Sequence, residues 1–343
     1  MSFLSNAWYM AAWSEEITAT LLRRKITGIP VVLFRLQNGR VAALEDRCPH
    51  RFAPLSLGTR EGDAIRCGYH GLTFDATGAC IRNPFSDRIP PGAQVRAFII
   101  EERDHIVWLW TGKPEKADTA AIPRFDSLNA ANGMPPLKGC MAMRANYEFG
   151  TDNLMDLSHI EFVHRGSFAG AGVIFAGKHE VREAGTELNS NWWMPGVLAP
   201  GHTFGIYPRD MRTDHWLDMR WQPPASMLLE IGATPVGAKR EDGVIVRQAH
   251  IITPETEETS LYFWSTTRTT VTSTEEGDAM LRALMTQAFE VEDKPMIEAA
   301  YHNLNGEDFW ARKPVFLGVD AGGARARRLI QRLKAAEAET AAA

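Results

Sequence analysis

The sequence pairs one thiol with one imidazole in each of two short stretches, Asp46-Arg-Cys-Pro-His-Arg-Phe-Ala-Pro-Leu55 and Cys67-Gly-Tyr-His-Gly71. Cys48 and His50 belong to the first stretch, and Cys67 and His70 belong to the second. Both stretches follow segments with the pattern of β-strands, so each is expected to form a loop at the end of a hairpin. Two such loops at neighbouring hairpin ends can bring all four side chains together.

Two thiolates and two imidazoles suit either a tetrahedral zinc ion or a [2Fe–2S] cluster of the Rieske type. Zinc loops usually pair like ligands with like, as in C-x2-C and H-x3-5-H. In the cluster one iron takes both thiolates and the other takes both imidazoles, so each loop has to supply one of each, as here. Gly68 and Gly71 let the backbone approach the inorganic sulfides. The pattern therefore favours the [2Fe–2S] cluster, with zinc as the alternative.

The residues around these loops predict an all-β domain. They form short apolar and β-branched runs separated by turns, and glycine and proline recur throughout. The segment Thr111-Gly-Lys-Pro-Glu-Lys-Ala-Asp118 is polar and lacks periodicity, so we place a boundary there, after an N-terminal domain of residues 1–115. The predicted strands include Ile29–Phe34, Val41–Leu44, Gly71–Phe74 and His105–Trp110.

The composition is that of a folded globular protein, and it argues against several functional classes. The chain has 343 residues, of which 45% are hydrophobic and 23% are charged. A net charge of -5 argues against nucleic-acid binding, which usually needs a basic surface. We find neither an apolar run of about 18 residues nor the basic start of a signal peptide, so no membrane association is expected. With four cysteines a disulfide framework is improbable, and a cytoplasmic location is expected.

The second part of the chain, residues 116–343, predicts an α+β domain. A long amphipathic helix is expected over Gly277–Tyr301, because apolar residues recur there at helical spacing. A last helix is expected from about Ala324. Helices of this kind cover one face of an antiparallel sheet in α+β folds. The predicted strands include Ser226–Ile231, Val244–Thr253 and Leu261–Trp264.

A second group of metal-binding residue types lies in the segment Asn153-Leu-Met-Asp-Leu-Ser-His-Ile-Glu-Phe-Val-His164. His159 and His164 are five residues apart, so they diverge on an ideal helix and converge only if the helix ends or distorts near Ile160. Two imidazoles and one carboxylate make the facial triad of non-haem Fe(II) oxygenases, which leaves positions open for O2. The candidate carboxylate is Asp293, in the middle of the long helix. Alone this motif is weak, but an electron-storing cluster upstream needs an acceptor, and an iron site supplies one.

Together the two motifs resemble the oxygenase components of Rieske non-haem iron oxygenases, and in particular the vanillate and dicamba O-demethylase family. The resemblance covers nearly the whole chain, and the stretch Asp320–Gly323 is similar to the vanillate branch in particular. The stretches that carry it outside the two cysteine–histidine loops are Asn6-Ala-Trp-Tyr9, Asp152-Asn-Leu-Met-Asp-Leu157, Ile252-Thr-Pro-Glu-Thr256 and Asp320-Ala-Gly-Gly323.

The resemblance implies a role for each residue of the second group. His159, His164 and Asp293 would be the iron ligands, and Asn153 a polar neighbour of the iron. Asp156 would bridge His70 and an iron ligand across the subunit interface of a head-to-tail homotrimer. A carboxylate between two imidazole N–H groups fixes their orientation and couples the two metal sites.

The resemblance also implies the reaction. A separate NAD(P)H-dependent reductase would supply electrons to the cluster, because the chain has no convincing nicotinamide or flavin fingerprint. O2 would be the co-substrate, and a methoxylated aromatic acid such as vanillate would be demethylated to a phenol and formaldehyde. Two alternatives stay open. One is a Rieske oxygenase that hydroxylates a methyl group or ring or demethylates an amine. The other is a Rieske electron carrier whose second domain only binds a ligand.

Several further residues carry weaker expectations. By resemblance His250 contacts the substrate, and an ordinary buried strand histidine is the equal alternative. The same resemblance implies polar or aromatic substrate contacts in the dicamba enzyme at the positions of Leu229 and Leu284, which argues against dicamba as the substrate. Cys80 and Cys140 are expected in the core. The last helix carries a cluster of arginines that is expected to form a solvated helix face, and the alternative is a docking surface for an acidic reductase. The cluster consists of Arg325, Arg327, Arg328 and Arg332.

Overall fold

The computed structural model describes residues 3–129, 135–168 and 172–342, and it divides into two compact units. The first unit comprises the residues up to 122 together with 253–257, and the second comprises 123–252 and 258–343. The first unit is built from strands and the second from one large sheet with helices, as the sequence predicts. Within the described residues, we find no helix with the length and apolar character that a membrane crossing requires.

The first unit contains three small antiparallel sheets. Their strand orders are β1-β10-β9, β2-β3-β4 and β5-β6-β7-β8. All residues of β1 and β10 are buried, because both strands are apolar on both faces. The strands are β1 (Trp8–Trp13), β2 (Leu22–Ile26), β3 (Ile29–Arg35), β4 (Val41–Glu45), β5 (Thr59–Glu61), β6 (Ala64–Arg66), β7 (Thr73–Phe74), β8 (Cys80–Arg82), β9 (Ile100–Arg103) and β10 (Ile106–Trp110).

One hydrophobic cluster holds the cysteine loops in place. Cys48 and Cys67 are both buried in it, together with apolar side chains of β3, β4, β6 and β7. The loop containing Cys48 follows β4, and the loop containing Cys67 follows β6, so both leave the ends of strands that contribute to this core. Packing of the strands therefore fixes the positions of the two thiols.

The second unit is built on a seven-stranded antiparallel sheet with the order β11-β17-β16-β15-β14-β13-β12. The sequence predicts β15, β16 and β17 but not β11, β12, β13 and β14, although β13 alternates buried and less buried residues in the manner of a half-buried strand. The strands are β11 (Leu137–Met143), β12 (Lys178–Ala184), β13 (Glu187–Leu198), β14 (Arg212–Gln222), β15 (Ser226–Pro235), β16 (Val244–Pro254) and β17 (Ser260–Thr266).

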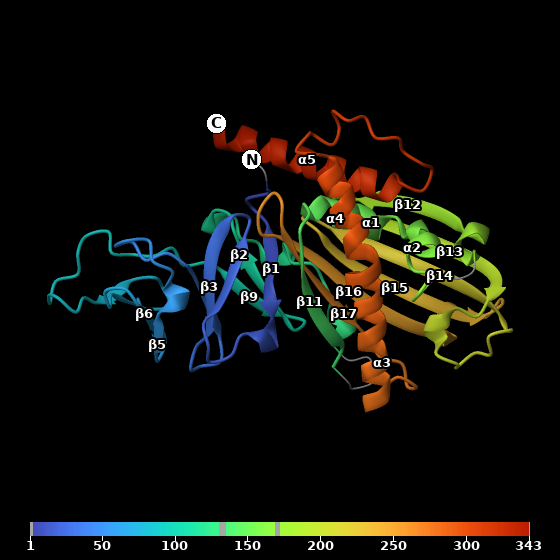
Figure 1. Cartoon of the computed structure of the whole chain (residues 1–343), viewed down its shortest axis with the longest axis horizontal. Helices are drawn as coiled ribbons and strands as arrows, with labels where there is room; N and C mark the ends of the chain where they lie inside the picture. The colour runs from blue at the N-terminus through green and yellow to red at the C-terminus, as the bar shows by residue number, and fades with distance from the viewer. Residues whose placement is uncertain (1–2, 130–134, 169–171, 343) are drawn as a thin grey trace. The chain divides into compact units, whose positions relative to one another are not determined.

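Helices lie along one face of this sheet, with α3 and α4 running across β15, β16 and β17 and α5 passing beside α1 (Figure 1). Contacts on that face include the Ser190 hydroxyl, which donates to the Met155 carbonyl at the end of α1 (3.2 Å). Gln248 of β16 contacts Met285 of α3 on the same face. The helices are α1 (Tyr147–Met155), α2 (Ile160–Val163), α3 (Glu275–Thr286), α4 (Lys294–Asn303) and α5 (Ala321–Ala342).

The single helix expected over Gly277–Tyr301 is interrupted. A π-helical segment, Gln287–Asp293, separates α3 from α4 and ends at the candidate iron ligand. Insertions of this kind occur frequently at functional sites. The segment buries Ala288, Phe289 and Asp293 against the sheet.

Two sequence predictions about single residues are wrong. Cys140 is exposed rather than in the core, because Leu137, Met141 and Met143 take the inward positions of β11 and leave Cys140 on the outer face. Arg327 is not on a solvated helix face but buried, where it pairs with Glu148 and Asp152 of α1. Cys80 is buried as expected.

Candidate metal centres

The four cysteine and histidine side chains of the first unit converge. The rings of His50 and His70 lie edge to face with their centroids 4.5 Å apart. The thiols of Cys48 and Cys67 lie within hydrogen-bonding reach of each other in the core below. The structure thus gives a buried pair of sulfurs and a more exposed pair of imidazoles, as a cluster ligated at one iron by sulfur and at the other by nitrogen requires.

The loops around this group are held by backbone contacts. The buried carboxylate of Asp46 accepts hydrogen bonds from the backbone N–H (2.6 Å) and the hydroxyl (2.7 Å) of Ser56. A Cβ atom on Gly68 would lie 2.8 Å from the carbonyl oxygen of Leu57, so only glycine fits this approach of the two loops. Gly71 adopts a left-handed conformation with φ of 76°. The geometry around the thiols therefore exists in the polypeptide itself.

The electrostatics of these ligands fit a metal cluster. Burial, together with the neighbouring Cys67 thiol, raises the pKa of the Cys48 thiol to about 11, although the backbone N–H groups of His50 and Arg51 act to lower it. Such a thiol is neutral unless a metal binds and displaces its proton. Nδ1 of His70 is buried and has no hydrogen-bond partner among the described residues. A buried imidazole nitrogen without a partner is costly, and coordination to iron would satisfy it.

In the second unit, helix α1 ends at Met155, so the break that lets the two histidines converge falls at Asp156, a little before Ile160. Asp156 has an extended backbone, and its carboxylate accepts a hydrogen bond from the N–H of Ser158 (2.9 Å), which caps the following 3-10 turn, Leu157–His159. His159 ends this turn, and His164 follows directly after α2. Because of this break the two imidazoles converge, with ring centroids 5.2 Å apart.

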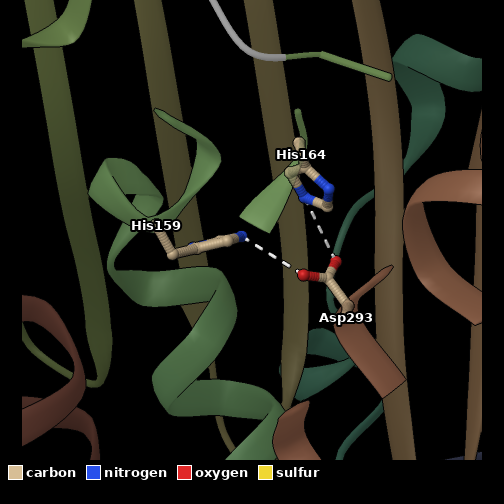
Figure 2. A group of neighbouring side chains, drawn as sticks. All are labelled: His159, His164 and Asp293. Carbon is tan, nitrogen blue, oxygen red and sulfur yellow. Dashed lines mark ion pairs between the residues drawn. The ribbon is translucent and has the colours of Figure 1, made fainter. Parts of the chain in front are cut away.

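His159, His164 and Asp293 form one group whose ligand atoms all lie within 4.8 Å of one another. Figure 2 shows both imidazoles turned toward the carboxylate of Asp293, which enters from the π-helical segment. Nε2 of His159 lies 3.5 Å from Oδ1 of Asp293, and Nε2 of His164 lies 3.4 Å from Oδ2. The Asn153 amide donates to Oδ1 of Asp293 (3.3 Å). The structure thus brings together all four residues that the sequence analysis places at this site.

The protonation of the two histidines differs. Burial lowers the pKa of His159 below its usual 6.5, and the charge of Asp293 only partly opposes this. Burial also acts to lower the pKa of His164, but hydrogen bonds and charges from Asp293 and Glu292 outweigh it and raise that pKa. Asp293 is only 2% exposed. A buried carboxylate between two imidazoles with open nitrogens is a suitable place for a divalent cation.

Two hydrogen bonds to Nδ1 orient the imidazole rings of His159 and His164. The backbone carbonyl of Asp156 accepts a hydrogen bond from Nδ1 of His159 (2.6 Å), and the carboxylate of Glu292 accepts one from Nδ1 of His164 (2.9 Å). Both bonds leave Nε2 free to face Asp293. The sequence analysis misses Glu292, although its position beside Asp293 in the sequence is a signal that a second carboxylate reaches the site.

Asp156 itself borders a cavity of about 150 Å³ in the second unit. Asp152 and Asp320 add two further carboxylates to its wall, and the side chain of Val315 is 87% exposed beside it. The remaining lining residues are Phe309, Pro314, Phe316, Gly323 and Ala324. Asp156 is therefore accessible from outside the second unit.

His250 lies on β16 and is buried. Its Nδ1 is 2.6 Å from the hydroxyl of Tyr262, and its Nε2 has no partner among the described residues. Burial lowers the pKa of His250 to about 4, so the ring is neutral. The ring of Phe289, from the π-helical segment, packs edge to face against it. Leu229 is buried on the adjacent strand and pairs with Gln248.

Comparisons with known proteins agree with the two-domain architecture. The Rieske [2Fe–2S] domain model matches residues 7–98, and the model of the vanillate O-demethylase oxygenase C-terminal domain matches residues 143–336. The chain is 38% identical to the oxygenase component of chloroacetanilide N-alkylformylase from Rhizorhabdus wittichii, over 96% of this chain and 95% of that protein. It is 37% identical to the oxygenase component of dicamba O-demethylase from Stenotrophomonas maltophilia, over 98% of this chain and 100% of that protein.

Solved structures give the same result. The crystal structure of dicamba monooxygenase bound to dicamba is similar with a TM-score of 0.92 and 35% identity, and the match covers 99% of this chain and 100% of that chain. Another structure of that enzyme, with a TM-score of 0.86 and 33% identity over 99% of this chain and 100% of that chain, contains non-haem iron together with dicamba.

The fold and the matches define a Rieske-type oxygenase, with an N-terminal [2Fe–2S] domain and a C-terminal oxygenase domain. The chain belongs to the vanillate O-demethylase oxygenase family. It is the oxygenase component of a multi-component monooxygenase and works with a separate electron-donating component. The resemblance and the fold class that the sequence predicts are thereby confirmed, and the stand-alone electron carrier is excluded.

Proposed function

We propose that Cys48, His50, Cys67 and His70 ligate the [2Fe–2S] cluster, and that His159, His164 and Asp293 hold one Fe(II). The buried thiol pair and the orphaned Nδ1 of His70 support the first assignment. The group of two imidazoles and one carboxylate supports the second, and it is the single observation on which the proposal most depends. The boundary between the two functional domains is proposed at residue 115.

We further propose that the substrate is a methoxylated aromatic acid of the vanillate type, which the enzyme O-demethylates. The family match and the dicamba O-demethylase relative support the reaction. Leu229 and Leu284, where polar or aromatic contacts are expected in the dicamba enzyme, favour an acid other than dicamba. The overall reaction balances as ArOCH3 plus O2 plus two electrons and two protons giving ArOH, formaldehyde and water.

His250 is proposed as a substrate contact. Its Nε2 is buried and has no hydrogen-bond partner in the part of the chain that the structure describes, and Phe289 of the π-helical segment that carries Asp293 packs against the same ring. A buried polar atom of this kind selects a substrate with a complementary polar group. The apolar side chains of Leu229 and Phe289 would exclude water from the aromatic ring of the substrate.

Each residue of the iron site has a separate task in this proposal. Iron bound there supplies O2 activation. His159 and His164 present Nε2 because their Nδ1 protons are held by the Asp156 carbonyl and by Glu292. Asn153 donates to Oδ1 of Asp293 and so fixes the orientation of the carboxylate.

The electron path is proposed to run between copies of the chain in a homotrimer, with Asp156 bridging His70 of one copy and an iron ligand of the next. The accessible position of Asp156 beside the cavity supports this. Exposed aromatic side chains at the tip of the first unit, Phe52 and Tyr69, flank the histidines that would dock there. The electron donor is proposed to be an NAD(P)H-dependent reductase, and the location is proposed to be the cytoplasm.

The first test is formaldehyde release. Purified protein, NADH and a surrogate reductase are incubated with a panel of methoxybenzoates, after confirming spectroscopically that the cluster is reduced. Formaldehyde equal to the phenol formed from one member supports O-demethylation. Full reduction of the cluster without formaldehyde from any member contradicts it.

A second candidate reaction is oxidative N-dealkylation, which the chloroacetanilide N-alkylformylase relative favours. N-alkyl anilides added to the same panel distinguish the two, because the product is then a dealkylated anilide rather than a phenol.

A further inference from the structure

The carboxylate of Glu292 accepts four hydrogen bonds from two different segments, residues 164–167 and the start of its own π-helical segment. Oε2 accepts from Nδ1 of His164 (2.9 Å) and from the hydroxyl of Ser167 (2.5 Å). Oε1 accepts from the backbone N–H of Gly166 (3.0 Å) and from the amide of Gln287 (3.2 Å). The side chain of Glu292 is only 9% exposed. All four lone-pair directions of a carboxylate are thus used, without a lysine or arginine among these partners.

This arrangement fixes the tautomer of His164. An ionised carboxylate only accepts hydrogen bonds, so Nδ1 of His164 has to carry the proton. Nε2 then presents its lone pair toward Asp293, which lies 3.4 Å away. The donors Ser167, Gly166 and Gln287 occupy the other acceptor positions of Glu292 and hold its carboxylate in this orientation.

The π-helical segment lets two consecutive residues, Glu292 and Asp293, reach the same imidazole. Successive residues of a regular α-helix point about 100° apart, so neighbours rarely reach one small group. Here Glu292 contacts Nδ1 and Asp293 faces Nε2 of the same imidazole. The irregular segment that contains both residues ends at Asp293.

We propose that Glu292 is a positioning residue for the iron site. It holds His164 in the tautomer that can bind metal, and its negative charge strengthens the imidazole as a ligand. His159 receives only a neutral backbone carbonyl in the equivalent position, so the two histidines are unequal ligands. This inference rests on the proposed iron site and deepens it.

The test is metal affinity rather than turnover. The mononuclear site is emptied with a chelator under conditions that leave the cluster spectrum unchanged, and Fe(II) binding is then measured anaerobically by chelator competition. Glu292→Gln keeps the shape of the side chain but removes its charge. Its NH2 group replaces one carboxylate oxygen and cannot accept hydrogen bonds, so one pair of donors, either His164 with Ser167 or Gly166 with Gln287, loses its acceptor. We expect a roughly 10- to 100-fold weaker Fe(II) affinity in this variant.

Two matched variants separate positioning from simple support of the loop. Ser167→Ala removes one bond to the same oxygen but keeps the imidazole bond and the charge, so its affinity should stay within about threefold of wild type. Glu290→Gln removes an exposed carboxylate from the same π-helical segment and should have no effect. Glu292→Asp keeps an acceptor-only group, so it should bind Fe(II) more tightly than Glu292→Gln. If the glutamine variant folds poorly, Glu292→Asp is compared with Ser167→Ala instead, because the shorter side chain draws the carboxylate away from Nδ1 of His164 and should weaken Fe(II) binding more than loss of the Ser167 bond does.

Wild-type affinity in Glu292→Gln would overturn the inference while leaving the iron site intact. An equal loss in Ser167→Ala would also overturn it, because support of the loop would then explain the effect. Wild-type protein that binds no Fe(II) beyond its cluster would overturn the iron site itself and the inference with it.

Discussion

Arg327 of α5 should be one of the most important single side chains for the stability of the second unit. Its guanidinium lies 2.7 Å from Oδ2 of Asp152 and 3.0 Å from Oε2 of Glu148, and its side chain is only 5% exposed. The charge also lies over the ring of Phe309, 3.9 Å from the centroid. The perturbation is Arg327→Met, which keeps the length of the side chain and removes the charge.

The magnitude follows from which partner is left alone. Glu148 keeps Lys334 at 3.3 Å, but Asp152 loses its cation. Removing one member of a buried ion pair costs about 3 to 5 kcal/mol. Asp152 keeps 31% of its side chain exposed, so the low end applies, about 3 kcal/mol. For a unit of this size 1 kcal/mol corresponds to about 2 to 4 °C, which gives a fall in Tm of roughly 6 to 12 °C.

The assay is thermal unfolding of Arg327→Met beside Arg332→Met. Arg332 lies on the same helix and pairs with Glu183 at 2.8 Å, but it is 63% exposed. Exposed pairs contribute about 0 to 1 kcal/mol, so this control should shift the midpoint by no more than a few degrees. Equal shifts in the two variants would refute the account of Arg327 as a buried link between α5 and α1.

Three further predictions concern pH, electron transfer and metal. Burial lowers the pKa of His215 to about 4, so the unfolded chain binds more protons than the folded chain between pH 6.5 and 4, and stability falls as the pH falls through that window. His215→Gln should therefore remove up to about 3 kcal/mol of this loss of stability at pH 4, as measured by acid unfolding curves. An acid unfolding curve identical to that of wild type would argue against this role of His215. Asp156→Asn should keep the cluster's absorption spectrum but lose most turnover, so full activity in that variant would contradict the proposed bridge. Chelation of the mononuclear iron should lower the unfolding temperature. If free Fe(II) is 100-fold above its Kd before chelation, the free energy of unfolding should fall by about 2.7 kcal/mol. Calorimetry that shows no change on chelation would argue against a metal site.

The ligand pattern could be predicted from sequence because it is local. Cys48 with His50 and Cys67 with His70 are close along the chain, and the strands before them have clear apolar patterns. Asp293 was placed by the chemistry that a triad requires. What sequence reasoning could not supply is the π-helical segment, because its distortion depends on packing against the sheet and not on a local residue signal.

Other misses have different physical causes. The helix break falls at Asp156 because its own carboxylate caps the next turn. An aspartate at such a position is a sequence signal for the start of a new helical turn. Strand β13 was missed because Asn189 and Asn191 alternate with its buried residues and Ser190 is itself one of them, which dilutes the hydrophobicity of the strand, although buried and less buried residues still alternate over Glu187–Met194. Arg327 looks like its exposed neighbours in the sequence, since its burial is set by Glu148 and Asp152 on a distant helix.

The central claim is that one chain holds an electron-storing cluster and a separate iron, each on its own set of side chains. Iron and inorganic sulfide analysis of three proteins tests it most directly. Wild type should contain about three irons and two sulfides per chain. Asp293→Ala should contain about two irons with an unchanged cluster spectrum, and Cys67→Ser should lose the cluster but keep about one iron. An Asp293→Ala protein that still holds three irons, or a wild type that holds only two, would contradict the account.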